Sequence, residues 1–221
     1  MKKVKLFAGI LTTLLVISCA SLEPKYRDEE STSDFKYPFN KEIEKSFYLL
    51  GDGGYSPPGG SSLGLLAFKS YLDSVKKTEN ISIFLGDNIY PDGMPAEGSS
   101  GREEAEYRLD AQLDAIENYE GKVVFIPGNH DWYNEKLEGL DRQKDYLKEK
   151  FEDILVWSPE IGCGMESIEV SDNIQMIVID SQWYLEDWND NPKINDNCEQ
   201  IKTREAMFLE VESEIKKNQN K

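Results

Sequence analysis

Residues 123–131 read VVFIPGNHD, and this stretch decides the fold. Its first half is a short run of β-branched and aromatic residues, which is typical of a buried strand. Gly128 follows the run and allows a sharp turn where the strand ends. Asn129, His130 and Asp131 come directly after that turn, and their side chains can bind ions or move protons. The stretch therefore predicts a strand that delivers polar groups to one edge of a sheet.

The same arrangement occurs twice upstream. Residues 46–52 read SFYLLGD, and residues 81–87 read ISIFLGD. Each is a short apolar run, then a glycine, then an aspartate, Asp52 or Asp87. The shared unit is too short and too unevenly spaced to be a solenoid repeat. It indicates three strands that each end in a turn carrying a side-chain oxygen.

Amphipathic helical patterns separate these runs, so strands alternate with helices along the chain. We predict an α/β domain with a mostly parallel central sheet and flanking helices. A fourth strand is expected to end at Asp180, and loops rich in proline, glycine and serine are expected to rim the site. The predicted helices cover residues 63–77, 102–119, 135–154 and 202–217, the fourth strand residues 174–179, and the loops residues 55–62 and 91–101.

Ligands of such sheets collect beyond the carboxyl ends of the strands, so we expect Asp52, Asp87 and Asn129 to converge there. Two carboxylates and an amide oxygen suit hard or borderline cations, and one carboxylate can bridge two ions that clamp a phosphoryl oxygen. Tyr90 lies three residues after Asp87, where a phenolate would suit a trivalent ion such as Fe(III).

His130 and Asp131 are the predicted catalytic residues. A histidine beside a metal ligand can reach a substrate oxygen as an acid or a hydrogen-bond donor. The neighbouring carboxylate could raise the pKa of the imidazole or fix its tautomer. Taken singly, the three motifs are compatible with ordinary turns, but their shared order and placement favour a metal site.

The motifs GDGG (51–54), GDNIY (86–90) and GNHD (128–131) resemble those of the calcineurin-like metallophosphoesterases. They are most similar to the purple or tartrate-resistant acid phosphatase branch, because Gly54 replaces the usual histidine and Tyr90 is present. The resemblance implies the N-terminal half of an α/β/β/α sandwich that hydrolyses phosphoric esters at a dinuclear metal centre. In that centre Asp52, Asp87 and Tyr90 would hold Fe(III), and Asp87 would bridge to a divalent Fe, Zn or Mn ion.

The resemblance also implies that Asn129 holds this second ion and that His130 contacts the phosphate and assists the leaving group. The family takes three further histidine ligands from later motifs, whereas His130 is the only histidine in this sequence. We therefore expect a C-terminally incomplete domain, from a fragment, a split gene or a degenerate protein, with little activity by itself. The alternative is a non-catalytic envelope lipoprotein that retains the scaffold for binding or assembly.

The N-terminus predicts export. Residues 1–18 combine a basic start with a short apolar core, as in a signal peptide, and Cys19 lies where a bacterial lipoprotein is cleaved and acylated. We expect an anchor in the bacterial cell envelope, periplasmic or on the cell surface, with a polar tether over residues 19–45 and the catalytic domain over residues 46–221. An ordinary signal peptide with an incidental cysteine is the alternative.

The remaining cysteines, Cys163 and Cys198, can either form a disulfide or stay as free thiols. The formal net charge of -17 argues against nucleic acid as a partner, since phosphate backbones are bound through basic surfaces. A phosphate ester is the expected substrate. The sequence leaves the ester, the divalent metal and the oligomeric state open.

Overall fold

A computed structural model describes residues 42–75, 78–151, 155–188, 193–195, 197–199 and 201–219 of the chain. The predicted signal peptide, Cys19 and residues 19–41 of the predicted tether lie outside the described residues. Within the described residues, no helix is both long and apolar enough to cross a membrane.

Four parallel strands form the central sheet, in the order β1-β2-β3-β4. Their registers place the last residues side by side, because Leu50 pairs with Phe84, Phe84 with Phe125, and Phe125 with Trp157. The turns that follow the first three strands therefore start at the same edge. The predicted α/β class is confirmed. The strands are β1 (Phe47–Leu50), β2 (Ile81–Phe84), β3 (Lys122–Phe125) and β4 (Leu155–Trp157).

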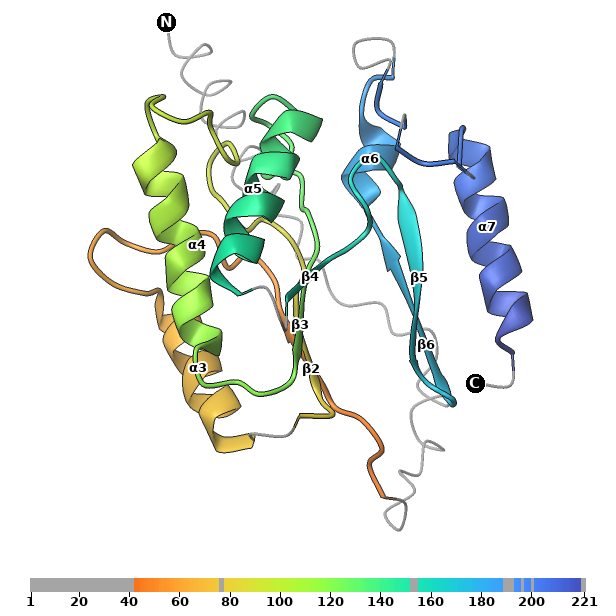
Figure 1. Ribbon diagram of the computed structural model, residues 1–221, viewed down its shortest axis with the longest axis horizontal. Coiled ribbons are helices and arrows are strands. Elements are labelled where there is room, and N and C mark those ends of the chain that lie inside the picture. The colour runs from red at the N-terminus through yellow and green to blue at the C-terminus, as the bar shows by residue number, and fades with distance from the viewer. Residues whose placement is uncertain are drawn as a thin grey trace, which may run out of the picture. The chain divides into compact units, whose positions relative to one another are not determined.

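Three helices cover one face of this sheet, as Figure 1 shows. Alternate strand residues face them, and Phe84 stacks on Phe125 with ring centroids 4.3 Å apart. Leu65, Leu72 and Leu109 of the helices complete this core and are almost fully buried. The helices are α3 (Leu63–Val75), α4 (Arg102–Ile116) and α5 (Leu137–Lys150).

The opposite face carries a two-stranded antiparallel ribbon of β5 (Met165–Ser171) and β6 (Ile174–Ile179). Val170 and Met176 of the ribbon pack on the sheet residues Ile81, Ile83 and Val124. The strand predicted over residues 174–179 is confirmed, and it lies in the ribbon. The fourth strand of the main sheet is β4, which was not predicted.

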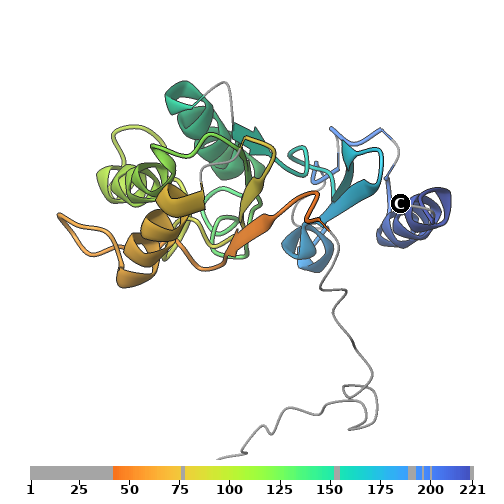
Figure 2. The ribbon, with the colours of Figure 1, turned by 90° about the horizontal axis from the view of Figure 1, so that it is seen from below.

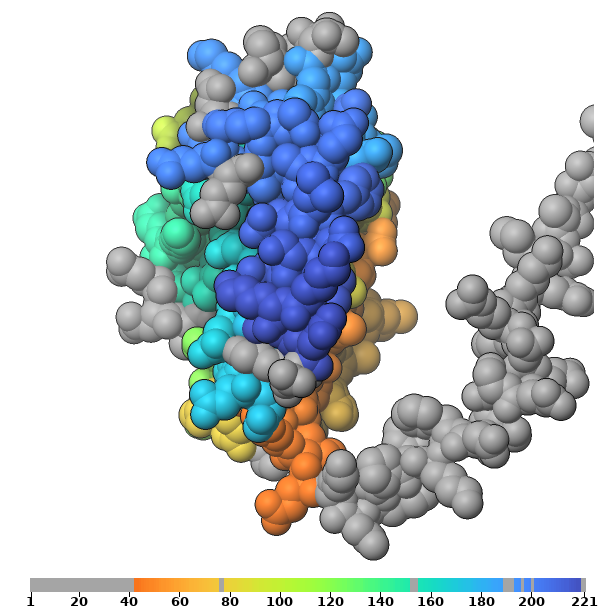
Figure 3. Space-filling view, turned by 90° about the vertical axis from the view of Figure 1, so that its right-hand side faces the viewer, coloured from red at the N-terminus to blue at the C-terminus, as the bar shows by residue number. Residues whose placement is uncertain are grey.

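Helix α7 (Arg204–Lys217) lies outside the ribbon and forms the outer surface on that side (Figures 2 and 3). Ser167 of β5 donates a 2.6 Å hydrogen bond to the Glu214 carboxylate of α7. Cys163 and Cys198 form a disulfide, which resolves the choice between a bridge and free thiols. The bridge connects the start of the ribbon to the segment that leads into α7.

Candidate metal centre

The turns after β1 and β2 hold their aspartates in an uncommon backbone conformation. Asp52 has φ 56° and Asp87 has φ 54°, both in the left-handed region, which is sterically costly for most residues with a side chain. Aspartate tolerates this region better than most residues, and such strained positions cluster at functional sites. Gly86, with φ 103°, lets the second turn double back directly before Asp87.

Glycines allow the three turns to touch through their backbones. Gly54 donates a 2.9 Å hydrogen bond to the Asp87 carbonyl, and a Cβ on Gly54 would lie 2.3 Å from the carbonyl carbon of Asn88. A Cβ on Gly128 would lie equally close, 2.3 Å, to the Asp87 backbone nitrogen. Position 54 therefore has no room for any side chain. The second motif therefore packs against both the first and the third.

This packing brings three oxygen donors together. The Tyr90 hydroxyl donates to Asp52 Oδ1 at 2.5 Å and to Asp87 Oδ2 at 2.9 Å. The hydrogen bond to Asp52, burial, and the hydrogen bond to Asp87 together raise the pKa of Tyr90 well above its usual value, because each stabilises the neutral phenol. The oxygens of Asp52, Asp87 and Tyr90 thus meet at one place, to which a cation would be attracted.

The third motif joins this cluster through Asp87, whose Oδ1 accepts a 3.0 Å hydrogen bond from the His130 backbone N–H. The His130 ring contacts the rings of Tyr90 and Tyr133, with centroids 4.2 Å and 4.9 Å away. Its Nδ1 lies 2.5 Å from the Pro91 carbonyl oxygen, so Nδ1 carries the donated proton and Nε2 is left for other partners. The contact between His130 and Pro91 was not predicted from the sequence, because a residue of any type can offer its backbone carbonyl.

Asp131 occupies a different position from the one expected. Its carboxylate is fully buried and accepts hydrogen bonds from the backbone N–H groups of Gly128, Asn88 and Ile89, at 2.7 to 3.1 Å. The Asn88 side chain adds another hydrogen bond at 3.2 Å. Asp131 therefore connects the second and third motif turns, and the expectation that it fixes the His130 tautomer is wrong, since Pro91 contacts that ring nitrogen.

A second buried carboxylate contacts Trp132, the residue that directly follows the third motif. Asp180 accepts a 3.0 Å hydrogen bond from the Trp132 indole and caps the short helix α6 (Ser181–Leu185) through the N–H groups of Gln182 and Trp183. Burial raises the pKa of Asp180 to about 7, and burial likewise raises the pKa of Asp131 to about 7. Ionising either carboxyl group in the folded protein therefore costs free energy.

Carboxylate and phenol oxygens are ligands that hard cations prefer, so Asp52, Asp87 and Tyr90 fit one such ion. A second ion would share Asp87 and take Asn129, which is half-buried and precedes His130, the residue whose backbone N–H donates to Asp87. In the part of the chain that the structure describes, no three histidine, cysteine, aspartate or glutamate side chains are grouped to hold a metal. Three residues, Asp52, Asp87 and Tyr90, are available to the first ion, and only Asp87 and Asn129 to the second. The cluster therefore fits the first ion of a dinuclear centre better than the second.

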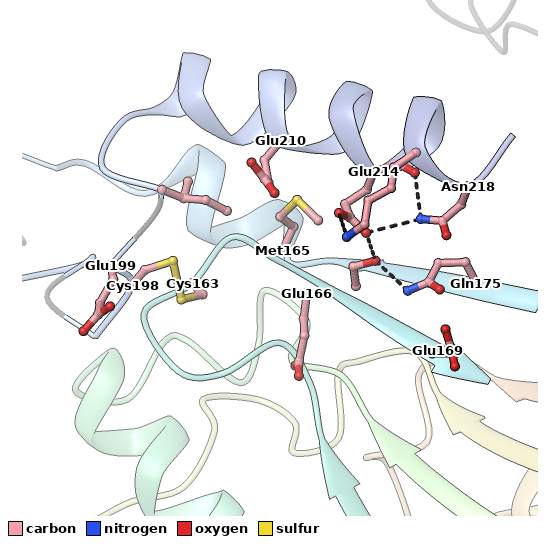
Figure 4. A pocket seen from close by; sticks show the side chains of 13 residues that line it. Cys163, Met165, Glu166, Glu169, Gln175, Cys198, Glu199, Glu210, Glu214 and Asn218 are labelled. Carbon is pink, nitrogen blue, oxygen red and sulfur yellow. Dashed lines mark hydrogen bonds and ion pairs between the residues drawn. A yellow bond between two sulfur atoms is a disulfide. The ribbon is translucent and has the colours of Figure 1, made fainter. Parts of the chain in front are cut away.

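A separate hollow of about 500 Å³ lies between the ribbon and α7 (Figure 4). The disulfide lies at one end, and Gln175 and Glu214 are joined across it through the Ser167 hydroxyl. None of its lining residues belongs to the three motifs. Its hydrogen bonds hold α7 on the ribbon, so the strand-end cluster remains the candidate site.

The sequence model described as calcineurin-like phosphoesterase matches residues 37–219. This range contains all three motifs and the whole parallel sheet. No curated protein and no solved structure matches the chain. Because the match covers well over half of the sequence, the chain belongs to the calcineurin-like phosphoesterase family.

Proposed function

We propose that the site is a phosphomonoesterase centre of the purple acid phosphatase type. The observation that carries the proposal is the Tyr90 hydroxyl between Asp52 and Asp87, because it puts a phenol oxygen into the ligand set of the first ion. Family membership supports a phosphoester hydrolase in general. The tyrosine supports the narrower type, with Fe(III) as the first ion and Fe, Zn or Mn as the second.

A dinuclear centre, when bound, supplies positive charge to the phosphoryl oxygens. Asp52, Asp87 and Tyr90 would hold the first ion, while Asp87 and Asn129 would hold the second. His130 would act on the substrate as the imidazolium, in which Nδ1–H stays on the Pro91 carbonyl and Nε2–H supplies the proton that the departing oxygen takes up. Asp131 acts as a positioning residue that keeps the second and third turns together.

This chain by itself should be a poor catalyst. His130 is its only histidine, so the second ion lacks the imidazole ligands that such ions favour. We expect the metal-loaded chain to bind orthophosphate, seen as metal-dependent broadening of the phosphorus NMR signal, and Asp87→Ala to abolish the effect. Hydrolysis of p-nitrophenyl phosphate should stay close to the metal-only blank.

Absence of metal-dependent phosphate binding would refute the phosphoesterase site. Fast, metal-dependent hydrolysis would instead refute the prediction that this chain is a poor catalyst. The alternative, a non-catalytic lipoprotein that keeps the scaffold, is favoured by the single histidine. It predicts that the wild-type chain and Asp87→Ala behave alike in both assays.

We also propose that the protein is exported and anchored through a lipid on Cys19. The apolar run that ends at Cys19 supports this, and so does the Cys163–Cys198 disulfide, since disulfides persist in oxidising compartments. Mass spectrometry of the mature protein from a bacterial envelope should find a diacylated N-terminal cysteine. An unmodified N-terminus, or acylation that persists in Cys19→Ser, would contradict the anchor.

A further inference from the structure

Tyr133 stands beside the candidate ligand Asn129 and has no part in the function described so far. The two residues are four positions apart in a turn, and the Asn129 Nδ2 donates a 2.6 Å hydrogen bond to the Tyr133 hydroxyl. An amide has a donating end and an accepting end, so a partner that engages the nitrogen also directs the oxygen. With its nitrogen on Tyr133, Asn129 keeps its carbonyl oxygen for another partner.

The same tyrosine also contacts the catalytic candidate. Its ring meets the His130 imidazole at 4.9 Å between centroids, with the planes inclined at 61°. Tyr90 lies against His130 from elsewhere, at 4.2 Å. The imidazole thus contacts two tyrosine rings, and its Nδ1 is engaged by the Pro91 carbonyl. Tyr133 therefore contacts both Asn129 and His130.

Tyr133 is 48% exposed, so burial does not explain its place. An exposed tyrosine contributes little to a core, and its hydroxyl could otherwise bond to water. The hydrogen bond instead fixes the orientation of the Asn129 amide. Without it, either the nitrogen or the oxygen of that amide could face the site. Groups that orient a ligand in this way commonly change metal affinity by about 10-fold to 100-fold when they are removed.

We propose that Tyr133 is a positioning residue that turns the Asn129 carbonyl oxygen toward the second cation. The proposal rests on the proposed function, since it needs Asn129 to be a ligand. It assigns the tyrosine no contact with the substrate. Its effect should therefore fall on the divalent ion, and the first ion at Asp52, Asp87 and Tyr90 should be unaffected.

The test is a set of Mn²⁺ titrations on the full chain after loading with iron, followed by calorimetry. Tyr133→Phe keeps the ring against His130 and removes only the hydroxyl, so we expect Mn²⁺ affinity about 10-fold weaker with an unchanged melting temperature. Tyr71→Phe is the matched control, because Tyr71 is 53% exposed on α3, its ring contacts Tyr48 of β1, and removal of its hydroxyl should change nothing. In an Asn129→Ala background, Tyr133→Phe should have no further effect.

A readout without metal completes the design. In proton–nitrogen NMR spectra of the metal-free chain, the Asn129 side-chain amide should shift in Tyr133→Phe and stay fixed in Tyr71→Phe. Unchanged Mn²⁺ affinity in Tyr133→Phe would overturn the proposal, as would an equal loss in the Asn129→Ala background. If the wild-type chain binds none of Mn²⁺, Zn²⁺ and Fe²⁺, the second-ion site of the proposed function fails as well. Unchanged affinity in Tyr133→Phe alone refutes only the positioning role, so the two failures are distinguishable.

Discussion

At the scale of single residues, the candidate site depends on backbone contact between turns, and Gly54 is the tightest of these contacts. Alanine at this position would put its Cβ 2.3 to 2.5 Å from backbone atoms of Asp87 and Asn88, which cannot move aside as a flexible side chain can. We expect Gly54→Ala to lower the free energy of unfolding by about 1–3 kcal/mol. Urea denaturation measures the change.

Gly51→Ala is the control for this substitution. Gly51 belongs to the same motif, but a Cβ there would meet nothing within 4 Å. It should change stability by no more than about 0.5 kcal/mol. Equal effects of the two substitutions would show that the turns do not pack as described.

Asp180 gives a pH-dependent prediction at the same scale. Its pKa is about 7 in the folded protein against an ordinary 3.8, so between these values the folded state binds more protons than the unfolded state. Stability from this group is therefore greatest below pH 4 and is lost as the pH rises toward 7, by about 1.4 kcal/mol per pH unit within that window.

Asp180→Asn cannot titrate and retains a carbonyl oxygen for the N–H groups of Gln182 and Trp183. The wild type minus variant difference in the free energy of unfolding should therefore decline between pH 4 and pH 7. Denaturation at several pH values measures it, and Asp131, whose charge contributes to the raised pKa of Asp180, is present in both proteins. Parallel pH profiles would show that Asp180 is not held neutral by burial.

Some site residues could be predicted from sequence and others could not, for a physical reason. The meeting of Asp52 and Asp87 follows from the rule that parallel strands end at one edge, and it needs only the apolar runs and glycines. The partners of Asp131 do not follow, because they depend on the path of two turns. Tyr133 follows Asn129 by four residues, but a tyrosine in a turn is too weak a signal to predict its role.

At the scale of elements, the disulfide and the Ser167–Glu214 hydrogen bond hold α7 on the ribbon. The cysteines are 35 residues apart, so closing that loop restricts the unfolded chain. We expect reduction to lower the free energy of unfolding by about 3–4 kcal/mol. Urea denaturation with and without reductant measures this.

The double variant Cys163→Ser, Cys198→Ser is the control for reduction. It should be as unstable as the reduced wild type and insensitive to reductant. If wild type and double variant have the same stability without reductant, the bridge contributes nothing and α7 is held by its side-chain contacts alone.

Helices α3, α4, α5 and α7 were predictable from their amphipathic period, and the first three strands from their short apolar runs, whereas the five-residue helix α6 was not predicted. Helix α7, expected over residues 202–217, begins two residues later, where Thr203 caps it through the Ala206 N–H. Strand β5 was missed, since its sequence MESIEVS has neither a continuous apolar run nor strict alternation, as two polar residues separate Met165 from Ile168. Strand β4 has only three residues, too few for any pattern to detect.

At the scale of the whole molecule, part of the second sheet face is uncovered. Phe47 and Leu49 of β1 alternate with the residues that face the helices, so they point to the ribbon side, and both are exposed. Within the described residues, β6 has a hydrogen-bonded neighbour on one side only. Exposed apolar side chains beside a free strand edge favour self-association.

We expect the chain to associate in a concentration-dependent way in sedimentation velocity, and Leu49→Lys to weaken that association. Leu66→Lys is the control, because Leu66 is similarly exposed, at 50% against 57% for Leu49, but lies on α3. A monomer at all concentrations would contradict the prediction, as would equal effects of the two substitutions.

The central claim is that Asp52, Asp87 and Tyr90 surround one cation at the carboxyl ends of β1 and β2. The most direct measurement is the visible spectrum of the chain titrated with Fe(III), alongside Tyr90→Phe and Tyr71→Phe. The account predicts a tyrosinate-to-iron charge-transfer band in the wild type and in Tyr71→Phe, and its loss in Tyr90→Phe. A wild-type chain that binds iron without this band, or a band that survives in Tyr90→Phe, would contradict it.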